Sequence, residues 1–452
     1  MKSMVAPLIL ALCLTVTAPV TAQQNDTDID GLLNREDGDT TAHEDVEFGP
    51  TLVREDLIGA VLERNPGMAQ AQNAWQAAAE RPDQVKAWED LRAMYAFGPQ
   101  SIGSDRFGWQ AAIEQRFPWF GKKGFAQEAA EANADALAGE FATVQLQLAY
   151  RASLLFDDYF LIERALEVNQ QHIDLLSDLK KSAESMYAAG LALQVNPLQA
   201  DVELAHTEHA RLILQADRDI VRARINGLLH RAPESPLPPP PDAQPVPRLE
   251  TLVDTALADS ALVNRPDLRS IEARVLSAEA SRRLAGREYW PDFSLFLSHN
   301  TMWQHPDHRT MLGIRLNVPL QLGRRGAAAR EAEANIKMWR NRHAVLSDQV
   351  RVDVIEARRR AREAIDIAAL YEERLVPVSR DQVNAARSAF EAGRLDFSRV
   401  IDAEKNLRTV ELEYLDAIAS AYRHLADLDR TVGVIPFLGI EPDLTRLKED
   451  QK

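Results

Sequence analysis

The chain has 452 residues, a formal net charge of −16 at pH 7 and a single cysteine. An acidic chain of this kind is a poor ligand for nucleic acid, and one cysteine excludes an internal disulfide framework. No stretch after residue 22 contains the ~20 consecutive apolar residues of a membrane-spanning helix, so any membrane crossing must use strands.

Residues 1–22 have the pattern of a secretory signal peptide. Lys2 gives the positive start, an apolar stretch follows, and Val20-Thr21-Ala22 is a small-residue cleavage site. Cys13 lies inside this segment, and the large Leu12 before it is atypical of a lipoprotein processing site. We therefore expect ordinary cleavage and a mature chain without cysteine, outside the cytoplasm.

The first mature segments are a polar tail and two helices. Residues 23–50 carry nine acidic side chains against one basic one, which predicts a disordered acidic tail. Thr51 is a candidate N-cap for the first helix, which Asn65-Pro66 breaks. A second helix is predicted from residue 67 into the high eighties.

A strand pair is predicted at about 91–117, because the side chains alternate with period two. The apolar face of this pair contains Leu91, Ala93, Tyr95, Phe97, Phe107, Trp109, Ala111 and Ile113. Gln110 and Glu114 fall on the opposite, polar face. Pro118 ends the pair within the sequence FPWFGKKG, since proline cannot donate to a sheet ladder.

A long helical hairpin follows, with an outgoing helix at about 124–187 and a return helix to about residue 230. The predicted seam of the outgoing helix has a heptad-like spacing. It consists of Phe141, Val144, Leu148, Arg151, Leu155, Tyr159, Ile162, Leu166, Asn169, Ile173 and Leu176. Gly190 is expected to end the helix. We interpret residues 51–232 as the first structural repeat.

Residues 233–248 form a linker with eight prolines, and after it the same order of elements begins again. The second repeat, 249–435, has helices at about 249–263 and 267–287 and a strand pair at about 292–319. Leu312, Ile314, Leu316 and Val318 share one face of its last strand, and Met311, Gly313, Arg315 and Asn317 share the other.

The second repeat ends in a long helix from about residue 327, a turn at Gly393 and a return helix to about residue 433, followed by a C-terminal tail at 436–452. The expected seam of the long helix is Ile336, Trp339, His343, Leu346, Val350, Asp353, Ala357, Ala361, Ala364, Ala368, Tyr371 and Leu375. The motif VPLQLGRRG corresponds to FPWFGKKG at an offset near 200 residues, which indicates a tandem duplication.

Strands of ~9–10 residues suit a tilted crossing of a bilayer, with their apolar face toward lipid. The polar residues Gln110, Glu114, Arg315 and Asn317 would then face a water-filled lumen. Four strands cannot close a barrel, since membrane barrels use about eight or more, and open edges are not tolerated in hydrocarbon. The chain is therefore expected to pool strands with copies of itself. A soluble sandwich with one exposed face is the alternative.

Over about residues 50–435 the sequence resembles the TolC family of outer membrane efflux proteins. The resemblance depends on RPDLRSIEARVLSAEASRRLAGREYWPDFSL, on LNVPLQLGRRGAAAREAEANI and on the segment from YEERLVPVSRDQ to HLADLDRTVG. It implies a mostly α chain with membrane β: tandem coiled-coil hairpins, and four strands per chain in a trimeric twelve-stranded barrel. It also implies a periplasmic adaptor and an inner-membrane pump of the RND type or a similar one as partners, in the outer membrane of a Gram-negative bacterium.

The resemblance implies that the tunnel closes at its periplasmic tip through charged residues after the second turn. Asp402 matches an acidic constriction position, whereas the preceding acidic position holds Arg399. We expect Arg394, Asp396, Arg399 and Asp402 to form the gate region, with charge pairs between helices. The hairpin tips at Gly190, Leu191, Gly393 and Leu395 are the expected docking points for the adaptor.

Other site chemistry is weak in this sequence. FPWFGKKG is similar to family members paired with heavy-metal pumps, so heavy-metal efflux is one open reading. However, the groups Glu203, His206, His209 and His299, Met302, His305, His308 lack the closed ligand set of a metal site and are interpreted as surface residues.

The sequence has no nucleophile elbow, phosphate loop or dinucleotide fingerprint, so we expect neither an enzyme nor a cofactor. The rival reading is a periplasmic helical adaptor or scaffold without a membrane span. Two hairpins and two strand pairs favour the channel. The transported substrate stays open.

Overall fold

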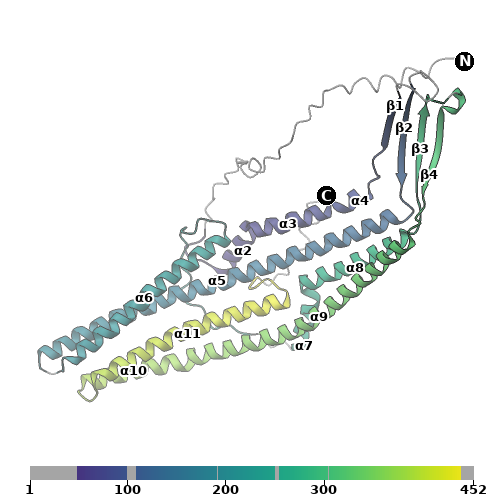
Figure 1. Ribbon diagram of the computed structural model, residues 1–452. Helices are drawn as coiled ribbons and strands as arrows, with labels where there is room; N and C mark the ends of the chain where they lie inside the picture. Colours follow the sequence, from purple (N-terminus) through teal and green to yellow (C-terminus); the bar gives the residue numbers. More distant parts are fainter. Residues whose placement is uncertain (1–47, 99–107, 191, 250–253, 304, 439–452) are drawn as a thin grey trace. The chain divides into compact units, whose positions relative to one another are not determined.

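A computed structural model describes residues 48–98, 108–190, 192–249, 254–303 and 305–438, which belong to one compact unit. The predicted signal peptide, the acidic tail before residue 48 and the C-terminal tail after residue 438 lie outside these ranges. Figure 1 shows long helices running side by side and a small sheet beyond one end of them.

Helices and strands follow in the same order in each half of the chain. The first half contains α2 (Arg54–Arg64), α3 (Pro66–Ala79), α4 (Arg81–Lys86), β1 (Arg92–Gly98), β2 (Gly108–Phe117), α5 (Lys122–Ala188) and α6 (Val195–Leu228). The second half contains α7 (Asp254–Asn264), α8 (Pro266–Arg287), β3 (Asp292–Asn300), η1 (Pro306–His308), β4 (Thr310–Asn317), α9 (Leu322–Leu370), η2 (Tyr371–Leu375), α10 (Val376–Glu391) and α11 (Phe397–Val432). The prediction of a mostly helical chain with four strands is confirmed.

The four strands form one antiparallel sheet in the order β1-β2-β3-β4. The two hairpins have equivalent registers, because Arg92 lies opposite Glu114 in the first and Ser294 lies opposite Arg315 in the second. The middle pairing, β2 with β3, joins the two halves of the chain. Gly313 makes room for a neighbouring ring, because a Cβ there would lie 2.4 Å from Cζ of Phe296 and the ring would have to move.

The longest helix, α5, packs along both α6 and α8, and also contacts α11 and the N-terminal helices (Figure 1). It therefore buries residues around most of its circumference rather than along one seam. The predicted seam positions Phe141, Leu148 and Tyr159 are buried. Arg151 is exposed, so its assignment to the seam was wrong. A long arginine at that position keeps its charge in water, while small residues such as Ala152 fill the contact.

Both hairpin turns use glycine in the left-handed region that disfavours other residues. Gly190 has φ +71 and Gly393 has φ +66, and Gly433 ends α11 with φ +92. These three glycines lie where the sequence predicted the helices to end.

The second long helix is less regular than predicted. It begins at Leu322 rather than near Ala327, and its backbone widens into a π-helical turn, η2, between α9 and α10. Pro377 explains the turn, because proline has no N–H to donate to the preceding turn and its ring crowds the carbonyl there.

Two other helix boundaries differ from the sequence-based prediction. α2 begins at Arg54 with Val53 as its N-cap, so Thr51 is not the cap. Pro82 divides the expected second helix into α3 and α4. α7 is described from Asp254 onward, and the residues between 249 and 254, where its start was predicted, lie outside the described ranges. Asn65 does break the first helix, and its side chain caps α3 by accepting from Gly67 N at 2.9 Å.

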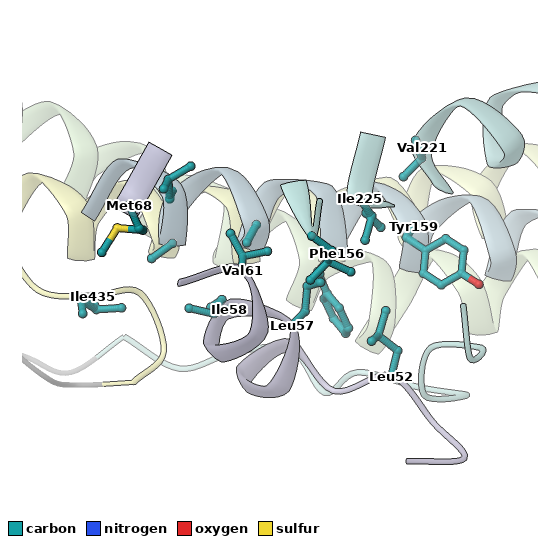
Figure 2. Packing of buried hydrophobic residues seen from close by; sticks show 14 of the residues in the cluster. Leu52, Leu57, Ile58, Val61, Met68, Phe156, Tyr159, Val221, Ile225 and Ile435 are labelled. Atoms are coloured by element: carbon teal, nitrogen blue, oxygen red, sulfur yellow. The ribbon is translucent and has the colours of Figure 1, made fainter. Parts of the chain in front are cut away.

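The largest core cluster joins the N-terminal segment, the first hairpin and the turn after α11. Figure 2 shows Leu57 and Val61 of α2 against Phe156 of α5 and Ile225 of α6, with Ile435 at one side. Burying aliphatic and aromatic side chains of this size stabilises the fold by about 1.5–3 kcal/mol each. The N-terminal segment is therefore held against the hairpin by its own apolar side chains.

Next to this core, a buried arginine links several elements. Arg54 Nη2 lies 2.7 Å from Asp157 Oδ1, and both side chains are almost fully buried. The guanidinium also lies 4.3 Å to 4.7 Å from the centres of three aromatic rings. These rings belong to Phe156, Tyr422 and Phe437. Aromatic faces and a carboxylate together replace the water that a buried guanidinium loses.

The proline-rich linker passes between the two halves without helix or strand in its described part. Backbone carbonyls of the linker accept hydrogen bonds from Leu52 N at 2.9 Å, Tyr159 OH at 3.2 Å and Tyr422 OH at 3.0 Å. The linker is thus held by groups from both repeats and acts as an extended brace.

Candidate functional site

The strand register places the predicted lumen residues on one face of the sheet. Gln110 and Glu114 alternate along β2, and Arg315 and Asn317 lie on the same face of β4 through their pairing with β3. Glu114 accepts a hydrogen bond from Ser294 Oγ at 2.6 Å and forms an ion pair with Arg315. The guanidinium of Arg315 also lies 5.3 Å from the centre of the Phe296 ring.

The opposite face of the sheet is apolar and exposed. Its exposed side chains are Tyr95, Phe97, Ile113, Leu295, Leu297, Leu312, Ile314 and Leu316. Leu312 is 79% exposed and Ile314 68% exposed, which is unusual for aliphatic residues in a sheet. A contiguous apolar face of this kind indicates contact with lipid or with another chain.

Both edges of the sheet are open among the described residues, since β1 and β4 each pair with one strand only. Unpaired strand edges carry free N–H and C=O groups that favour pairing with a further strand. The sheet therefore has the properties of an incomplete wall, with a wet face, an apolar face and two edges that can be extended.

A buried ionic junction connects the sheet to the helices. Lys122 Nζ, at the start of α5, lies 2.8 Å from Asp292 Oδ1 at the start of β3. Arg116 Nη2 lies 2.8 Å from the other carboxylate oxygen of Asp292. Trp119 and Trp290 stack beside this junction with ring centres 5.3 Å apart. This arrangement fixes where the strand pair of one repeat meets that of the other.

At the other end of the helices, the two hairpin turns approach each other through an apolar cluster. Phe397 and Ile401 of α11 pack with Leu176 of α5 and Ala200 of α6. Phe390 of α10 lies edge-on to Phe397, with ring centres 5.4 Å apart. The predicted docking glycines Gly190 and Gly393 are exposed in the turns, and Leu395 is half-buried. Leu191 lies outside the described residues.

Between these tips and the main core, polar contacts connect the two hairpins. Arg408 Nη1 of α11 donates to Thr207 Oγ1 of α6 at 2.5 Å, and Lys405 Nζ lies 3.6 Å from Glu203 Oε2. One helical turn further, His172 Nε2 of α5 lies 3.2 Å from Glu411 Oε2. These contacts hold α11 against the first hairpin.

The carboxylates of this region respond to burial in opposite ways. Burial raises the pKa of Glu404, although its ion pair with Arg387 at 3.0 Å opposes the shift. Burial also acts to raise the pKa of Glu411, but hydrogen bonds from His172 and Arg380 lower it below its ordinary value. Glu411 is thus held as an anion between two hairpins.

The four predicted gate residues, Arg394, Asp396, Arg399 and Asp402, are exposed near the turn after α10. Among the residues that the structure describes, no ion pair involves the side chain of any of them. Asp396 is the N-cap of α11, and its carbonyl accepts from Arg399 N at 3.0 Å. The expected charge pairs are therefore not seen within the described part of one chain.

The histidine groups considered as metal ligands do not assemble. Glu203 is buried and directed to Lys405, whereas His206 and His209 are exposed. His305 and His308 contact each other edge-on at 5.9 Å. Within the described part of the chain, no three His, Cys, Asp or Glu side chains are placed to hold a metal ion.

The contacts between the hairpins were missed in the sequence reading. A signal for them exists, because Glu404 and Glu411 are seven residues apart and fall on the buried side of a helix that is otherwise lined with apolar residues. Asn169, which was assigned to the seam, is the matching polar residue of α5 and donates to Thr207 O at 3.0 Å.

No described helix is both long enough and apolar enough to span a membrane. A comparison with the curated proteins finds no match. Residues 257–434 match the family model of the outer membrane efflux proteins.

Solved structures of outer membrane channels have the same fold. The chain is similar to the outer-membrane channel OprN, with 20% identity, a TM-score of 0.70, and 84% of this chain and 89% of that chain covered. The outer membrane protein VceC from Vibrio cholerae is 16% identical with a TM-score of 0.70, and the match covers 84% of this chain and 96% of that chain. The open state of the MtrE channel from Neisseria gonorrhoeae is 16% identical with a TM-score of 0.71, and the match covers 87% of this chain and 90% of that chain. The second half of the chain therefore contains a domain of the outer membrane efflux protein family, and the chain as a whole has the fold of outer membrane channels.

Proposed function

We propose that the protein is the outer membrane channel of a tripartite efflux pump, and that it works as three identical copies. Each copy would contribute its four strands to one barrel through the outer membrane and its hairpins to one periplasmic tunnel. The channel would be a passive conduit, and an inner-membrane pump of the RND type or a similar one would supply the energy through a periplasmic adaptor. No reaction and no cofactor is part of this function.

The observation that carries the proposal is the amphipathic sheet with two open edges. Its exposed aliphatic face suits lipid hydrocarbon, whereas Glu114 and Arg315 on the other face need water or each other. Open strand edges in hydrocarbon leave backbone groups without partners, at several kcal/mol each. Pairing with further copies removes both edges at once, which a single chain cannot do.

The proposal is tested by locating the full-length protein and measuring conduction. We expect it in the outer membrane fraction, as an assembly whose migration in detergent changes on heating, and with channel activity in planar bilayers. A periplasmic adaptor or scaffold would be found in the soluble fraction and would conduct nothing. That result would overturn the proposal.

The gate is proposed to lie at the hairpin tips. Arg394, Asp396, Arg399 and Asp402 are exposed and have no ionic partner within the described chain, so their partners would be supplied by neighbouring copies. The adaptor would open the gate by binding the turns at Gly190, Leu191, Gly393 and Leu395. This arrangement assigns charge pairing to the closed state and turn contacts to the open one.

Single-channel recordings of Arg399→Ala test this gate. Loss of the arginine removes attraction between copies at the tip, so we expect more frequent opening and higher mean conductance. Arg342→Ala is the matched control, because Arg342 is also exposed but lies on α9, far along the chain from the turn. If Arg399→Ala conducts as the wild type and the control do, Arg399 is not part of the gate.

A further inference from the structure

The two repeats contain the same junction between a strand and the next long helix. Because Arg92–Glu114 and Ser294–Arg315 are equivalent pairs, the repeats can be aligned residue by residue around the sheet. In this alignment Trp88 corresponds to Trp290, Asp90 to Asp292 and Trp119 to Leu320, and Lys122 corresponds to Arg324 once the one extra residue before GRRG in the second repeat is allowed for. Each base lies between two glycines, in GKKG and GRRG, directly after the strand.

Within one chain, only one pair of these junction halves is in contact. It joins the end of β2 to the start of β3, and three of its contacts involve the aligned residues. Lys122 Nζ lies 2.8 Å from Asp292 Oδ1, Trp119 N donates to the same oxygen at 2.9 Å, and the rings of Trp119 and Trp290 stack. An ion pair, a backbone hydrogen bond and an apolar contact thus act together.

The second junction has both of its halves in the chain, but they are not in contact. Arg324 follows β4 and Asp90 precedes β1, and both are exposed without an ion pair among the described residues. Their apolar neighbours are also largely exposed, Leu320 at 83% and Trp88 at 63%, although one side of the Trp88 ring contacts Phe117 and Lys123. Because β1 and β4 lie on opposite edges of the sheet, these halves cannot meet within one chain.

We propose that Arg324 forms an ion pair with Asp90 of the next copy of the chain, with Leu320 packed on the next copy's Trp88, so that the contact between copies repeats the junction between β2 and β3. This inference rests on the proposed function, in which copies pool their strands. It adds the residues and the strand register of the contact.

The alignment also fixes the register between β4 and the β1 of the next copy. In the chain, Glu114 lies opposite Phe296 and Ile113 opposite Leu297. The equivalent pairs are Arg315 opposite Met94 and Ile314 opposite Tyr95. In this register apolar residues meet apolar ones on one face, and the polar face continues across the contact. A slip of one residue would exchange the two faces, so only slips of two residues compete with it.

Charge reversal tests the ion pair in the full-length protein in membranes. Asp90→Arg and Arg324→Asp should each reduce the fraction of protein that stays assembled in detergent, and the double variant should restore it. Arg330→Asp is the matched control, because Arg330 is exposed six residues along α9 and has no described ionic partner. Arg330→Asp should not restore assembly in Asp90→Arg.

Two results of this experiment would overturn the ion pair. Single variants that assemble as well as the wild type would show that the two charges do not meet. A loss in Arg324→Asp that Asp90→Arg does not reverse would assign Arg324 to another ligand, such as a lipid phosphate.

Cysteine pairs test the register independently. Residues directly opposite each other in antiparallel strands lie about 4.5–5.5 Å apart at Cα, which permits a disulfide, whereas diagonal neighbours at about 7–8 Å do not form one readily. Met94→Cys with Arg315→Cys should give oxidised, covalently linked copies. Ala96→Cys with Arg315→Cys, offset by two residues, should not, and each single cysteine variant controls for nonspecific linkage.

The outcomes separate this inference from the proposed function. Linkage of the offset pair with no linkage of Met94→Cys and Arg315→Cys would overturn the register, while assembled copies would still support the channel. A wild-type protein that stays monomeric in membranes would overturn both.

Discussion

Lys122 Nζ and Asp292 Oδ1 lie 2.8 Å apart although 170 residues separate them in the sequence, and both side chains are almost fully buried. Removing one partner of a buried ion pair leaves the other charge uncompensated. We predict that Lys122→Ala destabilises the protein by about 3 kcal/mol, near the low end for such changes, because Arg116 still contacts Asp292. Lys123→Ala, at an only partly buried neighbour, should cost less. Thermal unfolding of the purified protein measures both, and equal effects would contradict this account.

The apolar face of the sheet makes a second prediction. Replacing Ile314 with Arg places a charge on the face assigned to lipid, where such changes cost about 2–4 kcal/mol at the bilayer midplane. We expect Ile314→Arg to reduce the amount of protein in the outer membrane strongly. Gly313 cannot serve as the control because Phe296 fills its space, so Asn317→Arg, on the polar face, is used. Comparable membrane levels of the two variants would reject the assignment of the faces.

A third prediction concerns the contact between the two hairpins. Arg408 donates a hydrogen bond to Thr207 Oγ1, and this bond is the shortest of the described polar contacts between α11 and α6. Hydrogen bonds with a charged partner contribute about 1.5–3 kcal/mol. Arg408→Ala should therefore loosen the second hairpin from the first and raise the open probability in bilayer recordings. Arg408→Lys retains a cationic donor, so its open probability should lie between that of Arg408→Ala and that of the wild type. If all three proteins had the same open probability, this contact would have no role in gating.

The pH dependence of stability gives a fourth prediction. Burial raises the pKa of Asp429 to about 6, and a hydrogen bond from Phe437 N at 3.3 Å offsets only part of this shift. The pKa of an aspartate in the unfolded chain is about 3.9, so the folded state binds more protons than the unfolded state between about pH 4 and pH 6. The contribution of Asp429 to stability is therefore complete below pH 4 and is lost as the pH rises to about 6. Two pKa units correspond to about 2.7 kcal/mol, which is an upper bound for this group.

Asp429→Asn tests this directly, since asparagine is neutral at every pH. At pH 7.5 the variant should unfold at a higher temperature than the wild type, and the difference should shrink at pH 5. Asp348→Asn, at an exposed residue of α9, is the control, and it should raise the unfolding temperature at pH 7.5 less than Asp429→Asn does. If the unfolding temperatures of Asp429→Asn and the wild type differed equally at both pH values, burial would not raise the pKa of Asp429.

Much of the local structure follows from short-range patterns in the sequence. The period-two alternation from Met311 to Val318 predicted β4 and its two faces, and Gly190 and Gly393 marked both turns. These features depend on backbone geometry and on which side chains tolerate water, so neighbouring residues are enough to reveal them. Thr51 shows the limit, because its cap chemistry was suitable but the helix begins three residues later.

Features that depend on packing between distant segments were not predictable in this way. The charge of Asp292 was visible, but its two basic partners are known only once β2 and β3 pair. Likewise, the predicted gate residues depend on the resemblance, and the described residues of one chain give them no ionic partner. Their partners depend on the other copies, whose placement no local pattern encodes.

The central claim is that one chain is an incomplete wall that three copies close. The mass of the native protein, extracted from the outer membrane in mild detergent and measured by native mass spectrometry, tests it most directly. We predict a single species of three mature chains, which separates into single chains on heating. A folded single chain extracted from the membrane, stable without copies of itself, would contradict the claim.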